Sequence, residues 1–203
     1  MTKTVKTSLL ASAALALAVA LGLPAPAAGQ DLHPSRRPSP MGLAQINLGD
    51  AYVSVTYSRP YKRGRDNIFG TKESGALVPF GEVWRTGANE ATQITLTRGF
   101  KVAGKELPAG TYSLFTTPGA EEWKILFNSA LGLSGTQRRN PETGEFEPGY
   151  DPKNDVVTVT AKPSALADEV DQFTISFEKT DTGADLVMRW IKTEVRVALS
   201  PLA

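Results

Sequence analysis

The segment Ala51–Pro60, AYVSVTYSRP, carries the pattern that decides the fold. Every second residue is apolar, at Val53, Val55 and Tyr57, and small polar residues stand between them. Successive side chains of a β-strand point to opposite faces, so this alternation predicts a strand that buries one face. Pro60 then ends the strand, because proline lacks the N–H group that pairs with a neighbouring strand.

The same alternation returns further along the chain, in segments separated by turn-forming residues such as Gly49-Asp50 and Ala103-Gly104. The segments are TQITLT (92–97), GTYSLFTTPG (110–119), EEWKILFN (121–128), DVVTVTA (155–161), QFTISFEKT (172–180), ADLVMRWI (184–191) and TEVRVAL (193–199). No segment keeps a helical period. We therefore predict a single all-β domain, an antiparallel β-sandwich or barrel-like fold of roughly eight to ten strands. The pattern leaves sandwich and barrel open, because strand order is not written in it.

The first 29 residues have the features of a signal peptide. Lys3 and Lys6 precede an uncharged apolar run from Leu9 to Leu23, and small residues follow, with cleavage expected before Gln30. The run is shorter than the roughly 20 apolar residues that cross a bilayer. No later segment is apolar and long enough to form a membrane helix, so we expect no membrane insertion of the mature chain. The prediction is an exported protein, periplasmic or secreted. Residues 30–41 then form an extended proline-rich tether, and residues 42–203 form the all-β domain.

Charge and composition exclude several classes of function. The chain has 22 basic and 21 acidic residues, and removal of Lys3 and Lys6 leaves 20 against 21. A nearly neutral chain argues against nucleic acid as a partner, since that binding relies on excess positive charge. The sequence has no cysteine, and its single histidine is His33 in the tether. Disulfides, zinc sites of the usual type and serine or cysteine triads are therefore not expected, and we predict neither a metal nor a cofactor. An enzyme is less expected than a binding protein.

Two long segments, 59–89 and 129–153, interrupt the strands, and the first contains candidate site residues. Strand alternation continued through Arg59, and continued backwards from Ile94 to Glu90, would aim both charges at the core side. One interpretation is an ion pair of Glu90 with Arg59 or Arg85 that closes one end of the core, with Trp84 as a lid.

The other interpretation is a small polar pocket. Arg59 and Arg85 would bind an anion there, Asn89 would supply an amide, and Trp84 or Tyr57 would form a stacking wall. Basic residues of YKRGRDNIFG (61–70) would add positive charge. The predicted ligand-binding residues are Tyr57, Arg59, Arg63, Trp84, Arg85, Asn89 and Glu90.

The segments YSRPYKRGRDNIFG, LVPFGEVWRTGANEATQIT and GKELPAGTYSLFTTPGAEEWKILFN resemble a family of secreted bacterial proteins, domain of unknown function 2911. The resemblance extends from about Ser39 to Leu199, and WRTGANEAT is its most specific part. It implies export and an all-β domain, and it implies no particular reaction. Residues 131–150 depart from the commoner family pattern, which has a shorter segment with a tryptophan.

Three functional hypotheses follow from the sequence. The first is an exported β-domain that binds a small acidic or polar molecule, such as a sugar derivative, at one end of the sandwich, in an opening formed by Arg59, Arg85, Asn89 and Glu90. The second is a hydrolase that acts through two carboxylates, Glu90 with Asp66 or Glu82, facing one cavity. The third is a structural or interaction module of the cell envelope, in which the polar cluster only supports the fold.

Overall fold

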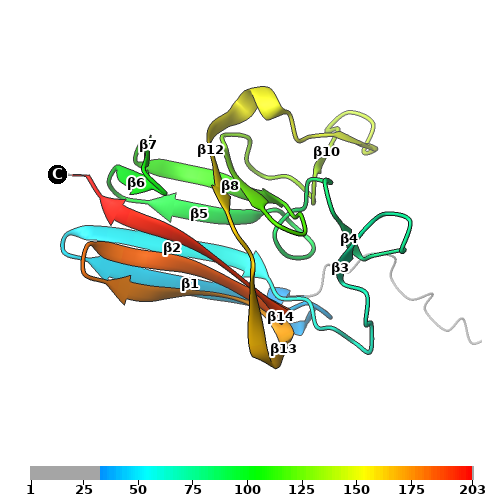
Figure 1. Ribbon diagram of the computed structural model, residues 1–203. Helices are drawn as coiled ribbons and strands as arrows, with labels where there is room; N and C mark the ends of the chain where they lie inside the picture. The colour runs from blue at the N-terminus through cyan, green and yellow to red at the C-terminus, as the bar shows by residue number, and fades with distance from the viewer. Residues whose placement is uncertain (1–32, 203) are drawn as a thin grey trace, which may run out of the picture. The chain divides into compact units, whose positions relative to one another are not determined.

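Two antiparallel sheets form the body of the protein in the computed structural model, which describes residues 33–202 (Figure 1). The first sheet has the order β1-β2-β5-β8-β9-β12, with β1 Met41–Leu48, β2 Ala51–Ser58, β5 Thr92–Leu96, β8 Gly110–Thr117, β9 Trp123–Asn128 and β12 Asp155–Ala161. The second has the order β13-β14-β6-β7, with β13 Ser164–Thr180, β14 Gly183–Pro201, β6 Phe100–Val102 and β7 Lys105–Leu107. The sheets do not close into a barrel, so the all-β prediction is confirmed as a sandwich.

The remaining elements are short and lie in the connections. They are η1 Pro34–Arg36, β3 Phe69–Gly70, β4 Val78–Pro79, β10 Gln137–Arg139, β11 Phe146–Pro148 and η2 Pro152–Asn154. The two long segments predicted between strands contain β3 with β4 and β10 with β11, and both gather on the right-hand side of Figure 1. Within residues 33–202, no helix has the length and apolar character needed to cross a membrane.

Hairpin turns occur where the turn-forming residues predicted them. Leu48 pairs with Ala51 around Gly49-Asp50, and Val102 pairs with Lys105 around Ala103-Gly104. The longest hairpin, β13 with β14, turns at Asp181-Thr182. Short turns set the register of a hairpin, and register decides which side chains face the core.

The main core lies between the two sheets, and the alternation of β2 explains how it forms. Val53 and Val55 are 0% exposed, and they pack in one cluster with Phe127 of β9 and Leu186 of β14. A fully buried side chain of this kind contributes about 1.5–3 kcal/mol to the free energy of unfolding. The inward residues of each strand therefore join the sheets.

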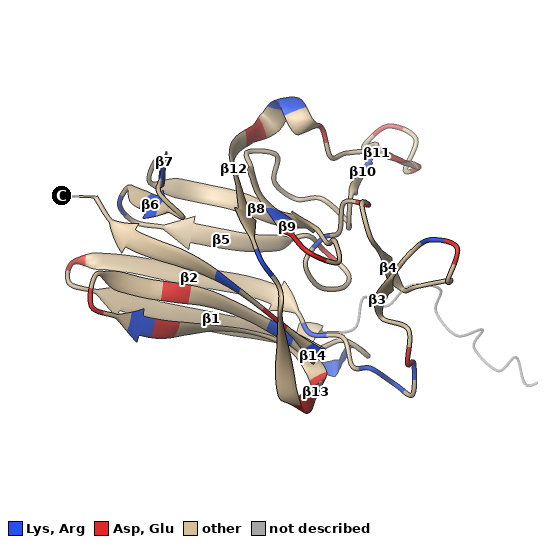
Figure 2. Ribbon diagram, viewed as in Figure 1, with Lys and Arg blue, Asp and Glu red and all other residues tan. Residues whose placement is uncertain are grey.

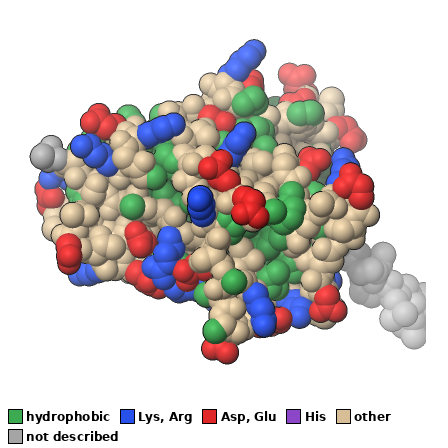
Figure 3. Space-filling view, in the orientation of Figure 1, with side chains coloured by type: hydrophobic (Ala, Val, Ile, Leu, Met, Phe, Trp, Pro, Cys, Tyr) green, Lys and Arg blue, Asp and Glu red, His purple; other side chains and the backbone are tan. Residues whose placement is uncertain are grey.

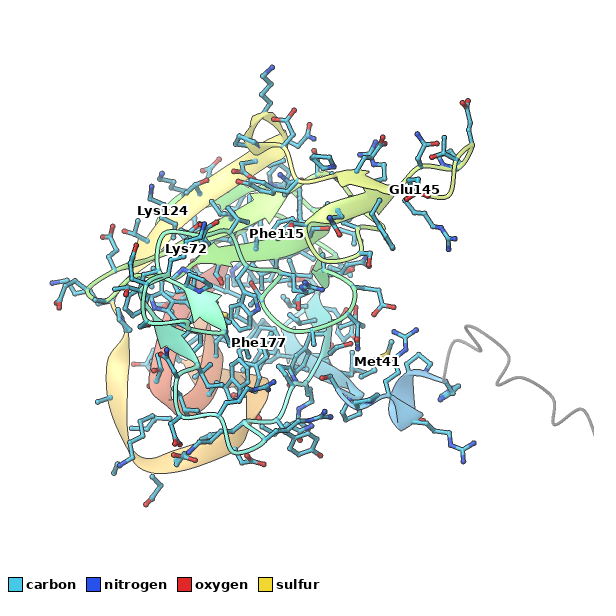
Figure 4. All side chains as sticks on the ribbon, turned by 90° about the vertical axis from the view of Figure 1, so that its right-hand side faces the viewer. Met41, Lys72, Phe115, Lys124, Glu145 and Phe177 are labelled. Carbon is cyan, nitrogen blue, oxygen red and sulfur yellow. The ribbon has the colours of Figure 1, made fainter. Side chains whose placement is uncertain are left out.

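A second, smaller apolar cluster lies apart from the main core. Its buried members are Ala91, Phe115, Leu126 and Leu133. The partly buried side chains of Val83, Ala130 and Tyr150 pack against them. Figure 4 shows this arrangement from the right-hand end, with Phe115 on the β8 side, Phe177 on the β13 side and Glu145 out on the β10–β11 hairpin. The two ends of the segment 129–150 thus pack on the sandwich, whereas β10 and β11 are exposed.

The predicted signal peptide lies outside the described residues, as does the start of the proline-rich tether. From His33 onward the tether is described, and its last residues contact the domain. The carbonyl oxygen of Pro40 accepts a hydrogen bond from the N–H of Arg59 at 2.9 Å, and that of Ser39 accepts one from the Asn89 amide at 3.1 Å. β1 begins directly afterwards, at Met41.

Candidate functional site

The segment from Trp84 to Thr92 turns sharply before it enters β5. The N–H of Trp84 donates to Thr116 O at 2.7 Å and Thr116 N–H donates back to Trp84 O at 3.0 Å, which fixes the entry on β8. Thr86 then has φ 55°, and Asn89 has φ 56°. Positive φ is rare for a β-branched residue, so the backbone is strained at Thr86.

Hydrogen bonds from the threonines of this segment hold the strained backbone in place. Thr92 Oγ1 donates to Thr86 O at 2.7 Å, and Thr86 Oγ1 bonds to Thr116 Oγ1 at 3.2 Å. The indole N–H of Trp84 closes the turn on Gly87 O at 3.0 Å. Gly87, at φ 156°, leaves no room for a side chain, because a Cβ atom would lie 2.7 Å from Ser58 O. The segment is therefore a rigid platform and not only an entry to a strand.

Trp84 closes one end of the aromatic core. Its ring stacks on Trp190 at a centroid distance of 6.0 Å and an interplanar angle of 13°, and it meets Phe173 edge to face at 5.1 Å. Phe69 and Trp123 also contact it at their edges. Trp84 is only 9% exposed, so most of its side chain packs against protein.

A cavity of about 290 Å³ lies over this platform, between the segments 60–65 and 84–89. It is lined by Ser39, Pro60, Arg63, Arg65, Leu77, Val78, Trp84, Arg85, Gly87, Ala88, Asn89 and Trp190. Four of the predicted site residues line it together, namely Arg63, Trp84, Arg85 and Asn89. Sequence reasoning missed Trp190, although the alternation of the 184–191 segment marks it as an inward residue.

Three arginines line the cavity, and each is anchored to a backbone carbonyl. Arg85 Nη1 donates to Asn89 O at 2.8 Å, Arg63 Nη2 to Pro38 O at 2.5 Å, and Arg65 Nη2 to Tyr61 O at 2.7 Å. Within the described residues none of the three forms an ion pair with a carboxylate. A carbonyl holds a guanidinium in position without neutralising it, so the cavity keeps its positive charge.

The acidic residues nearby pair with other bases. Asp66 lies 3.3 Å from Lys62, Glu82 lies 3.4 Å from Lys72, and Glu90 lies 2.5 Å from Arg37. Among residues 33–202, no aspartate or glutamate lines the cavity. Figure 2 shows the basic residues that gather in the connection between β2 and β3. The two carboxylates that a hydrolase would need do not meet in this cavity.

Arg85 is the most enclosed of the three arginines. Its guanidinium lies against Gly135, where a Cβ atom would come within 2.6 Å of the Arg85 Cζ atom. Burial lowers the pKa of Arg85 from its usual value. An arginine pKa starts so far above neutrality that the side chain remains charged. The long segment 129–153 thus contributes a wall to Arg85, whereas its own Arg138 and Arg139 are exposed and do not line the cavity.

Arg59 and Tyr57 lie elsewhere, at the junction of the two sheets. Arg59 points inward, as alternation predicted, but it donates to Phe173 O at 3.2 Å and to Thr174 Oγ1 at 2.8 Å. Tyr57 is 6% exposed and bonds to the backbone of Ile175. Neither residue lines the 290 Å³ cavity. The polar atoms of both side chains form hydrogen bonds to residues of the edge strand β13.

The prediction that Glu90 faces the core is wrong, and so is its pairing with Arg59 or Arg85. The positive φ of Asn89 breaks the strand alternation between Glu90 and Thr92. The Glu90 side chain is 56% exposed and pairs with Arg37, a residue of the predicted tether. The balance of burial against the Arg37 hydrogen bond leaves the pKa of Glu90 lowered. Glu90 and Tyr57 line a separate hollow of about 160 Å³.

The site lies at the end of the sandwich where β3 and β4 are found. Figure 3, in the orientation of Figure 1, shows hydrophobic side chains gathered on the right-hand part of the face turned to the viewer, with acidic and basic side chains around them. Leu77, which lines the cavity, is 46% exposed. Within residues 33–202, no three side chains of histidine, aspartate or glutamate gather as a metal site would require. The cavity thus combines arginine donors with an apolar wall.

Comparison with known proteins gives one match. No curated protein and no solved structure shows significant similarity to this chain. A family model described as "Protein of unknown function (DUF2911)" matches residues 39–199, which include the six-stranded sheet, the four-stranded sheet as far as Leu199 of β14, and every residue that lines the cavity. The chain belongs to this family of unknown function.

Proposed function

We propose that this protein is exported and binds a small anionic molecule in the cavity lined by Arg63, Arg65 and Arg85. The observation that carries the proposal is the way these arginines are held. Each donates one N–H group to a backbone carbonyl and has no carboxylate partner among the described residues. A guanidinium has five N–H donors in a fork that suits carboxylate and phosphate groups, so donors remain for a ligand.

The charges of the neighbourhood support the same proposal. Uncompensated positive charge is costly when it is partly buried, and folding alone gives no reason to leave Arg85 without a counter-ion. Nearby bases do have acidic partners, as Lys62 has in Asp66 and Glu169. A bound anion would supply the missing charge at the arginines. Strained backbone beside the cavity, at Thr86, is also typical of binding sites.

Size and shape set the class of ligand. A volume of about 290 Å³ is at the lower end of the range for small-molecule sites, roughly 300–1,000 Å³. Pro60, Leu77, Trp84 and Trp190 provide apolar parts of the cavity wall. The ligand is therefore a metabolite-sized acid with some apolar surface. Export of the protein would place this binding outside the cytoplasm. Catalysis by paired carboxylates has less support, because none of the described residues that line the cavity carries a carboxylate.

Binding is tested by titrating the purified protein with small acids, including inorganic phosphate, phenyl phosphate, phthalate and benzoate. Trp84 and Trp190 line the cavity, so tryptophan fluorescence reports occupancy and calorimetry gives the affinity. Arg85→Gln should weaken binding at least tenfold, as expected for loss of a charge-assisted pair. Arg98→Gln is the matched control, since Arg98 pairs with Asp50 and does not line the cavity. Absence of binding by every acid, or equal affinity in the Arg85 variant, would refute the proposal.

A further inference from the structure

We infer that the cavity selects ligands that carry at least two negative charges, a phosphate monoester or a dicarboxylate, over monocarboxylates of the same size. The inference rests on the proposed function and narrows it. It depends on the number and positions of the cavity arginines and on the residues that pair with the acids around them.

The arginines reach the cavity from two separate parts of the chain. Arg63 and Arg65 come from the segment that follows β2, and Arg85 comes from the platform that precedes β5. Their anchors differ as well, since Arg63 is held by Pro38 on the N-terminal segment and Arg85 by Asn89 on the platform. Two independently positioned cationic groups therefore face one space, and a single carboxylate would neutralise at most part of their charge.

The acidic residues of the segment 59–90 do not neutralise the positive charge of the cavity arginines. The segment 59–90 contains six basic residues, Arg59, Lys62, Arg63, Arg65, Lys72 and Arg85, and four acidic ones, Asp66, Glu73, Glu82 and Glu90. Three of the acids are engaged with Lys62, Lys72 and Arg37, and Glu73 is exposed and does not line the cavity. Arg59 is turned away onto β13. The charge left facing the cavity is that of three arginines.

The Ser39 hydroxyl is a neutral donor at the cavity, whereas both N–H groups of the Asn89 amide are already donated within the protein. Ser39 and Asn89 line the wall, and the Asn89 Nδ2 group is fixed by Ser39 O and Ser58 Oγ. This amide is held by the fold and gives Asn89 a single orientation. The remaining wall is apolar, so the specificity of the site depends on the guanidinium groups and on the charge that they meet.

The test compares three ligands that share one aromatic ring and differ in charge. Benzoate carries one negative charge at neutral pH, phthalate carries two, and phenyl phosphate carries about two, because the second pKa of a phosphate ester is about 6. The second negative charge of the ligand would lie beside a partly exposed guanidinium. The energy of that charge–charge attraction lies between its value in bulk water and its value near a protein surface, so we expect about tenfold tighter binding. We expect phthalate or phenyl phosphate to bind at least tenfold more tightly than benzoate.

The two divalent ligands distinguish the source of the charge. Preference for phenyl phosphate assigns the site to phosphate esters, and preference for phthalate assigns it to dicarboxylates; either supports the inference. For phenyl phosphate, affinity should fall as the pH is lowered from 7.5 to 5, because the ester gains a proton while the arginines remain charged. Affinity that does not change over this range would contradict recognition of the dianion.

Variants then separate selectivity from binding. The two exposed arginines are replaced in Arg63→Gln/Arg65→Gln. Benzoate should bind this variant more weakly, and phthalate and phenyl phosphate should lose more affinity than benzoate, so that the ratio of divalent to monovalent affinity falls towards one. An unchanged ratio would contradict the inference. Circular dichroism and the unfolding temperature verify that the variant is folded. Equal affinity of the unmodified protein for all three ligands would overturn the inference and leave the proposed function intact. Failure of all three ligands and of inorganic phosphate to bind would overturn both the inference and the proposed function.

Discussion

The phenol oxygen of Tyr57 in β2 exchanges two hydrogen bonds with the backbone of Ile175 in β13. It accepts from Ile175 N–H at 2.8 Å and donates to Ile175 O at 3.2 Å. β13 is an edge strand of the four-stranded sheet, so these backbone groups have no strand partner on that side. A side chain from one sheet thus covers the edge of the other and joins the two layers.

Removal of this hydroxyl should lower stability. In Tyr57→Phe, a buried N–H and a buried carbonyl both lose their partner, and the expected cost is about 1–3 kcal/mol in the free energy of unfolding. Urea denaturation measures it. Tyr52→Phe is the matched control, because the Tyr52 hydroxyl bonds only to the exposed side chain of Gln45. Equal stability of the two variants would show that the contact with Ile175 contributes nothing.

Arg59 and Arg85 should differ in their effect on stability. Arg59→Ala removes both hydrogen bonds to β13, and we expect a loss of about 1–3 kcal/mol, or several degrees of unfolding temperature. Arg85→Ala removes one hydrogen bond but also relieves a charge that burial disfavours, so the unfolding temperature should barely change. Thermal melts measure both. A large loss for Arg85→Ala would mean that this residue serves the fold and not a ligand.

Gly87 should not tolerate alanine. The added Cβ atom would lie 2.7 Å from the carbonyl oxygen of Ser58, which belongs to the backbone of β2 and cannot move aside. Gly87→Ala should therefore cost more than the roughly 1–2 kcal/mol of an unfavourable φ alone, and it should weaken ligand binding through displacement of the platform. Gly49→Ala provides the comparison, because Gly49 also has positive φ but nothing lies within 4 Å of the added atom. Similar costs at the two positions would argue against the clash.

Stability should depend on pH through Glu194 in β14. The guanidinium of Arg196 and then that of Arg189 hold the pKa of this carboxyl below its usual range. A lowered pKa in the folded state means that the stabilisation is complete above the unfolded value, about 4.3, and is lost as the pH falls through the folded value. Glu194→Gln should therefore reduce the free energy of unfolding at pH 7 and reduce it much less at pH 3.

Urea unfolding at the two pH values measures this difference. Glu106→Gln is the control, because Glu106 is exposed and takes part in none of the ion pairs within residues 33–202. Its effect should be small at both values. A cost for Glu194→Gln that is equal at pH 7 and pH 3 would contradict the assigned role of the ion pairs.

Part of the site could be read from the sequence, and part could not. The density of polar and aromatic residues around Trp84 marked the segment as unusual, and Trp84, Arg85, Asn89 and Arg63 do line one cavity. Alternation failed at Glu90, because the rule assumes extended backbone and Asn89 has positive φ. The partner of Glu90, Arg37, is 53 residues away in the chain, in a segment predicted to be a tether.

Local pattern in the sequence determined the all-β class, the hairpin turns and the inward faces of the strands, because alternation and turn chemistry act over a few neighbouring residues. Tertiary structure alone decided that the sheets form an open sandwich, that Trp190 lies under Trp84, and that the acids of the first long segment pair with Lys62, Lys72 and Arg37. Those pairings leave the cavity arginines without a counter-ion among the residues that the structure describes. Which charges remain uncompensated depends on distances between residues far apart in the chain, and no local pattern contains those distances.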